Sequence, residues 1–240
     1  MATLLVDSRT RARRSTVTLK YLMAGTGLIM IAFLLAHMYG NLKVYGGQRS
    51  FDAYGEHLRT FGEPILPRSG FLLVLRVVLV ASVLAHIYAA VSLWKRDRAA
   101  AGRHGLSGRY ESTQNRRGVQ RSYSSFTLRW GGIIIALFIV FHLLHLSADN
   151  AIHPGGASSS SYVRLVNGFS IWYVTLFYVL SLLAVGFHLR HGIWSALTTL
   201  GMNTSPRRRR NLNLWATGVT LVITVGFLLP PLSVLFGLVD

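Results

Sequence analysis

The chain has 240 residues, of which 51% are hydrophobic and only 14% are charged, whereas about 25% of the residues in an ordinary soluble domain carry a charge. This composition indicates a membrane protein, and the absence of cysteine excludes disulfides, thiolate zinc sites and cysteine-ligated iron–sulfur clusters within the chain. Lys and Arg outnumber Asp and Glu by 25 to 8, but these charges cluster between apolar stretches, so membrane topology explains them better than nucleic-acid binding does.

A basic segment at residues 1–20 comes first, and it lacks the apolar core and small-residue cleavage site of a signal peptide. Five apolar stretches follow that reach the length of about 20 residues needed to span a membrane. They cover residues 21–42, 71–94, 128–146, 169–200 and 212–229, and the last ends at Pro230 and Pro231. We therefore predict an all-α membrane protein in which residues 21–238 form one domain of five transmembrane helices.

The loop charges predict the orientation of these helices, because Lys and Arg concentrate on the cytoplasmic side. The N-terminus, the second loop and the fourth loop carry 17 Lys and Arg residues, whereas the first and third loops carry five. The N-terminus should therefore be cytoplasmic and the C-terminus outside. The run of four arginines at 207–210 is typical of a stop signal that contacts lipid headgroups.

Six of the nine histidines fall within the predicted spans, and the first four spans each carry at least one. With a rise of about 1.5 Å per helical residue, they sort into an outer and an inner layer about 15 Å apart. Spans one and three supply the outer layer, and spans two and four supply the inner layer. The outer histidines are His37, His142 and His145, and the inner ones are His86, His188 and His191.

Two histidines that face each other at one depth suit a haem iron, because the porphyrin supplies four nitrogens and each imidazole supplies one axial nitrogen. Two such layers predict two b-type haems in a haem-binding bundle. A proton or metal-ion pathway is the alternative, although spans one to four contain no Asp or Glu to partner such a relay. Depth alone does not choose between His142 and His145, or between His188 and His191.

Four motifs carry a resemblance to a known family. Span one contains "AHMYGN" with His37, span two "VLAHIYAAV" with His86, span three "RWGGIIIALFIVFH" with His142, and span four "GFHLRHGIWS" with His188. In this order, the motifs resemble the single-chain, five-helix, dihaem cytochrome b membrane anchors of succinate:quinone oxidoreductases, which include succinate dehydrogenases and fumarate reductases. The resemblance covers nearly the whole chain.

The resemblance implies that the iron ligands are His37 with His142 on the outer haem and His86 with His188 on the inner haem. His145 and His191 would then contact a haem propionate, water or quinone, or simply pack.

Further candidate site residues follow from their positions near the span ends, because no quinone motif of the family transfers cleanly to this chain. Some relatives carry a glutamate two residues before the span-four ligand, where this chain has Gly186, so a proton pathway through that position is not expected. The arginines that could pair with haem propionates, or else extend toward the lipid headgroups, are Arg76 for the outer haem and Arg129 and Arg190 for the inner haem. The acidic candidates for a quinone site are Glu56 and Glu63.

The function implied by the resemblance is that of the cytochrome b anchor of a succinate dehydrogenase in the bacterial cytoplasmic membrane. A partner flavoprotein would oxidise succinate, and an iron–sulfur subunit, docked on basic loops that include Arg116 and Arg117, would pass electrons through the two haems to a quinone, expected to be menaquinone. The alternatives are a cytochrome b subunit of a hydrogenase or formate dehydrogenase, or a histidine-lined ion or proton transporter. The sequence leaves the oligomeric state open.

Overall fold

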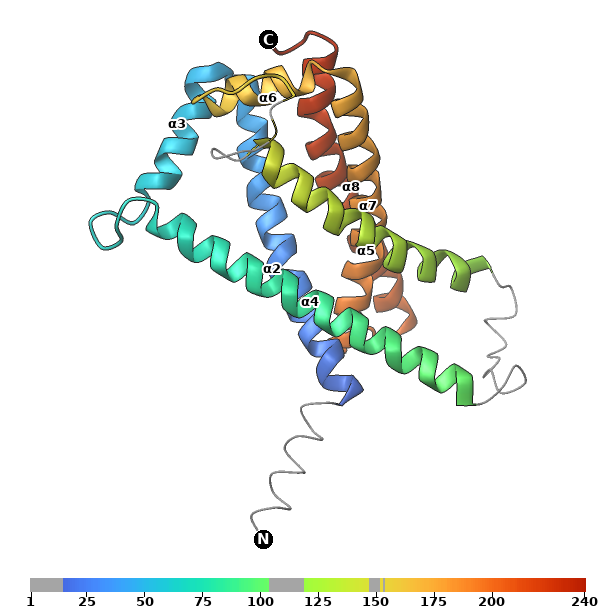
Figure 1. Cartoon of the computed structure of the whole chain (residues 1–240). Coiled ribbons are helices and arrows are strands. Elements are labelled where there is room, and N and C mark those ends of the chain that lie inside the picture. The colour runs from blue at the N-terminus through green and yellow to red at the C-terminus, as the bar shows by residue number, and fades with distance from the viewer. Residues whose placement is uncertain (1–14, 104–118, 147–151, 153) are drawn as a thin grey trace.

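The structure, a computed structural model, describes residues 15–103, 119–146, 152 and 154–240. Throughout this part of the chain the regular elements are helices, with no strand among them, and five helical segments are long and apolar enough to cross a membrane (Figure 1). The predicted all-α membrane fold is therefore confirmed, and the chain is an integral membrane protein. Residues 1–14 of the basic N-terminal segment and the loop arginines Arg116 and Arg117 lie outside the described residues.

The first spanning helix, α2 (Thr16–Leu42), begins before the predicted boundary at residue 21. Ser15 caps it, because its hydroxyl accepts a hydrogen bond from the backbone N–H of Thr18 at 3.0 Å. The first loop, predicted only as a connection, is largely helical: a short 3-10 turn, η1 (Lys43–Gly46), leads into the amphipathic helix α3 (Gly47–Thr60).

The second and third spanning helices both extend beyond their predicted boundaries on the basic side of the molecule. Helix α4 covers Gly70–Arg103 and helix α5 covers Val119–Leu146, compared with predicted spans of 71–94 and 128–146. Hydropathy marks only the apolar part of a helix, whereas Ala, Arg and Lys continue a helix readily in water. The extensions at the end of α4 are rich in these residues.

The predicted fourth span at 169–200 corresponds to one spanning helix, and its first residue, Phe169, ends a separate short helix before it. Residues Ser161–Phe169 form the short helix α6, and Trp172–Thr199 form the spanning helix α7. The Thr175 hydroxyl of α7 donates to the Phe169 carbonyl at 2.7 Å, so the two helices are joined by a hydrogen bond across the break. Hydropathy does not detect this break because the residues around it remain apolar.

The fifth spanning helix, α8 (Pro206–Leu235), starts earlier and ends later than predicted. Ser205 caps it by accepting a hydrogen bond from the Arg208 N–H, so the arginines at 207–210 form its first turns. The helix also continues through Pro230 and Pro231, where the sequence predicts a stop. Proline is tolerated inside membrane helices because neighbouring groups compensate for the lost backbone hydrogen bond.

Helix α2 lies at the centre of the bundle and packs against α4, α7 and α8, and α7 also packs against α8 and α5. The core between α7 and α8 includes Leu189, Ala216 and Ile223, which are buried. Other apolar side chains of α8, such as Trp215, remain exposed, as expected where lipid covers a helix. In Figure 1 the helices α3 and α6 lie together at the end of the bundle where the C-terminus lies, and α2 begins at the opposite end.

Candidate functional site

The outer histidine pair lies between helices α2 and α5. The ring centroids of His37 and His142 are 5.8 Å apart, and the ring planes are nearly perpendicular at 83°. Phe33 stacks on His37 at 5.2 Å, and Phe227 of α8 contacts the same ring at 5.6 Å. The structure therefore brings together the two residues that the family resemblance pairs, and aromatic side chains hold their rings.

The inner histidine pair lies between α4 and α7, with 6.3 Å between the ring centroids of His86 and His188. Nδ1 of His86 lies 3.1 Å from the hydroxyl of Thr26 on α2. That hydroxyl has one hydrogen and lies 2.7 Å from the Leu22 carbonyl, so it donates there and accepts from Nδ1–H of His86. This tautomer leaves the lone pair on Nε2 of His86, the nitrogen that a metal would take.

Glycines line the rings of the inner pair. A Cβ atom on Gly27 of α2 would lie 3.6 Å from Cε1 of His86, and a Cβ atom on Gly132 of α5 would lie 4.0 Å from Cε1 of His188. Because neither residue has a side chain, the backbones of α2 and α5 face the rings directly. Larger residues at these positions would occupy the space beside the imidazoles.

Spans three and four each contain a second histidine, His145 and His191, three residues beyond His142 and His188. His145 is only 2% exposed, and its Nδ1 lies 2.9 Å from the hydroxyl of Tyr178 on α7. His191 is partly buried on α7. His142 thus contacts His37 across the bundle, whereas His145 contacts Tyr178 and Phe169 on the side of α6 and α7.

The three candidate propionate arginines occupy different surroundings. Arg190 donates to the side-chain oxygen of Asn213 on α8 at 3.1 Å. Arg129 lies over the Trp94 ring, 5.8 Å from its centroid, and Arg76 is exposed on α4. The structure gives Arg129 and Arg190 protein partners and does not itself connect these arginines to the histidine pairs.

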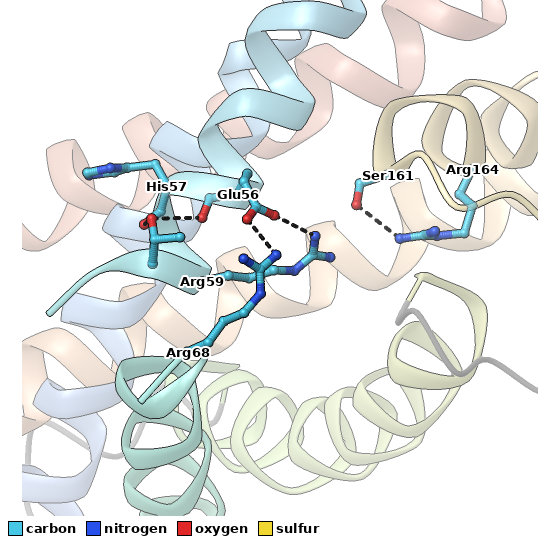
Figure 2. Close-up of polar contacts among 7 residues, drawn as sticks. Glu56, His57, Arg59, Arg68, Ser161 and Arg164 are labelled. Atoms are coloured by element: carbon cyan, nitrogen blue, oxygen red, sulfur yellow. Dashed lines mark hydrogen bonds and ion pairs between the residues drawn. The ribbon is translucent and has the colours of Figure 1, made fainter. Parts of the chain in front are cut away.

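Of the two acidic quinone candidates, Glu56 lies in a polar pocket and Glu63 is exposed in the turn after α3. The pocket encloses about 420 Å³ between α3 and the start of α6, with Asp52, Arg59 and Ser160 in its wall. Figure 2 shows the Glu56 carboxylate between two guanidinium groups, at 3.4 Å from Arg59 and 2.6 Å from Arg68.

Arg164 lies on α6 near this pocket and was not anticipated from the sequence as part of a site. It is 6% exposed and donates to the Ser158 carbonyl and, at 2.9 Å, to the Ser161 hydroxyl (Figure 2). Burial lowers the pKa of its guanidinium, the charge of Arg59 lowers it further, and Asp52 raises it.

Thr26 and Tyr178 are the polar neighbours of the histidine pairs that the sequence analysis missed. The depth of these two residues along their helices is a signal that could have identified them. Thr26 precedes His37 by a distance of about 16 Å along the helix, and Tyr178 precedes His188 by about 15 Å, so each lies at the level of the other histidine layer.

Taken together, the described residues form five membrane-spanning helices with two facing pairs of partly buried histidines, one pair toward each end of the bundle. Residues 113–228, just under half of the chain, match the model of the family described as the succinate dehydrogenase/fumarate reductase transmembrane subunit. The matched segment contains His142 and His188, one histidine of each pair, and it supports the family that the four motifs resemble. Comparison with curated proteins and with solved structures finds no match.

Proposed function

We propose that this chain is the membrane-anchor and cytochrome b subunit of a succinate:quinone oxidoreductase, working as a succinate dehydrogenase. The family match supports an anchor role in a succinate dehydrogenase or fumarate reductase complex. The pairing of His37 with His142 and of His86 with His188 is the observation that carries the haem part of the proposal.

The residues present fit two b-type haems. Among the described residues, no three His, Cys, Asp or Glu side chains gather into a complete metal site, so each pair offers two ligands to a metal whose other ligands come from elsewhere. A porphyrin supplies the four remaining ligands of a six-coordinate iron. Gly27 and Gly132 leave room beside the rings of the inner histidine pair. A bound haem would supply one-electron chemistry. The four histidines would hold the two haems, and Thr26 would orient His86.

The catalytic chemistry on succinate would belong to partner subunits. Without cysteine, the chain cannot itself ligate iron–sulfur clusters in the usual way, so an iron–sulfur subunit and a flavoprotein on the cytoplasmic side would deliver the electrons. A quinone, expected to be menaquinone, would receive them. Of the two acidic candidates for its site, Glu56 is better situated than Glu63, because it lines a pocket large enough to admit part of a small molecule.

Purification of the full chain from membranes, together with its bound partners, tests the proposal. We expect a reducible spectrum with Soret and α bands from two b-type haems per chain, and co-purification of a flavoprotein and an iron–sulfur protein. A preparation without such bands, despite adequate haem supply, would overturn the haem assignment and favour an ion or proton transporter. A different catalytic partner, such as a hydrogenase, would overturn the assignment to succinate dehydrogenase.

A further inference from the structure

The hydroxyl of Tyr178 lies between two histidines of the neighbouring helix. It is 2.9 Å from Nδ1 of His145 and 3.4 Å from Nδ1 of His142. The tyrosine belongs to α7 and both histidines belong to α5, so this group of three side chains joins two spanning helices next to the outer histidine pair.

Packing fixes the Tyr178 ring in this place. The residue is 3% exposed, and its ring meets the edges of Phe169 at 4.8 Å and Phe138 at 5.2 Å. A buried hydroxyl needs hydrogen-bond partners, since burial removes the water that would otherwise bond to it. The two imidazoles are the partners that the structure provides.

His145 is held from its other side by α6. A Cβ atom on Gly168 would lie 2.7 Å from Cε1 of His145, closer than real side chains approach each other. Only glycine fits at this position without displacing the ring. The imidazole of His145 is therefore confined between Gly168 and Tyr178, and its Nδ1 is directed at the tyrosine hydroxyl.

If His142 binds iron, the donor and the acceptor are determined in both hydrogen bonds of the Tyr178 hydroxyl. A ligand that binds through Nε2 carries its hydrogen on Nδ1, so His142 would donate to the Tyr178 oxygen. The Tyr178 O–H would then donate to Nδ1 of His145. The inner pair has a corresponding arrangement, in which the Thr26 hydroxyl accepts from Nδ1–H of His86.

We propose that Tyr178, itself held by His145, is a positioning residue that orients His142 for the outer haem and increases electron donation from its imidazole to the iron. The proposal rests on the proposed function, because it assumes a haem at the outer pair. It also gives His145 a role that differs from that of an iron ligand: it fixes the hydrogen bond that the ligand makes.

Substitution of Tyr178→Phe tests the proposal, because it removes the hydroxyl and keeps the ring that packs against Phe138 and Phe169. Loss of the acceptor for Nδ1–H makes the imidazole a weaker donor, which destabilises the ferric haem more than the ferrous haem. We expect both haems to be retained, the midpoint potential of the outer haem to shift upward, and the low-spin ferric resonance of that haem to change.

The readouts are a redox titration of the purified complex and its electron paramagnetic resonance spectrum, with the outer haem identified as the component lost in His37→Ala. Tyr173→Phe is the matched control, since Tyr173 lies on the same helix but is 57% exposed. The haem midpoint potentials of this variant should equal those of the wild type. His145→Leu should shift the outer potential in the same direction as Tyr178→Phe, because it releases the tyrosine hydroxyl.

An outer potential and resonance unchanged in Tyr178→Phe overturn the proposal, as does an equal shift of both haems. If Tyr178→Phe loses both haems, His145→Leu is the deciding variant. A shift in the midpoint potential of the outer haem alone would support the proposal, and no shift would contradict it. Absence of haem from the wild-type protein overturns the proposed function and this inference together, whereas an unchanged potential in the loaded protein overturns the inference alone.

Discussion

His142 and His145 lie three residues apart on α5 and both contact Tyr178, but their other partners differ. His142 meets His37 across the bundle, and its ring also contacts Phe138. His145 lies against Phe169 and hydrogen-bonds to Tyr178. Apart from Tyr178, the two histidines thus have different neighbours, and only the neighbours of His142 include a second histidine of the pairs proposed to bind haem.

At these two residues the substitutions His142→Ala and His145→Ala are expected to differ. His142→Ala removes one of the two histidines proposed to hold the outer haem, so on the proposed function the purified protein should contain one haem instead of two. His145→Ala leaves both ligands of the outer pair in place and should keep two haems. Haem content per chain, measured as the pyridine haemochrome, checks this, and the reverse pattern would show that His145 is the ligand.

The sequence predicts two layers of histidines because the depth of a residue follows from its position along a straight helix, and the family resemblance selects the pairs within them. It does not predict Tyr178 or Thr26 as their neighbours, because contact also depends on how each helix is rotated about its axis. A tyrosine in an apolar span has an ordinary packing explanation. The propionate arginines illustrate the same limit, since Arg190 faces Asn213 of α8, a partner that no local pattern indicates.

Helix α8 packs against α2 at Gly226, which is buried next to Met38. A Cβ atom at Gly226 would lie 2.8 Å from Cγ of Met38, and Met38 directly follows His37. The following residue, Phe227, contacts the His37 ring. The contact between these two helices therefore sets the position of one member of the outer pair.

Gly226→Ala should displace Met38 and destabilise the protein by about 1–2 kcal/mol, the usual cost of overpacking. The matched control is Gly218→Ala on the same helix, where an added Cβ meets no atom within 4 Å. Thermal unfolding in detergent, followed by circular dichroism, compares the two. Equal midpoints for both variants would contradict the close packing of α2 on α8.

The spans are predictable from sequence because apolar length is a local property, and all five were found in this way. The helix boundaries were less accurate for physical reasons. Pro230 and Pro231 indicate a stop in water, yet they lie inside α8, because membrane helices tolerate proline where other groups satisfy the freed carbonyls. The break before Trp172 depends on contacts between α6 and α7 that hydropathy does not contain.

At the scale of the whole molecule, an odd number of crossings among the described residues would place the start of α2 and the end of α8 on opposite sides of the membrane. The charge distribution predicts that the side with the second and fourth loops is cytoplasmic. Ser159, before α6, and Asn203, before α8, are exposed at positions suited to a test of this orientation.

Because the chain has no cysteine, single cysteines can be introduced without altering other thiols. In intact spheroplasts, a membrane-impermeant maleimide should label Ser159→Cys and should label Asn203→Cys only after permeabilisation. The reason is that the former lies on the predicted outer side and the latter on the cytoplasmic side. Gel-shift detection of labelled protein checks this, and the inverse labelling pattern would reverse the topology.

The start of α6 is bonded to α3 through Asp52. One carboxylate oxygen accepts from the Ser160 hydroxyl at 2.6 Å, and the other accepts from the Tyr162 N–H at 3.2 Å. Ser160 in turn accepts from the Val163 N–H. Amides in the first turn of a helix normally lack a protein partner and exchange with solvent quickly. Here Tyr162 and Val163 are protected, so α6 should open together with α3 as one cooperative unit, and the outer end of the bundle should exchange its amide hydrogens in a single step.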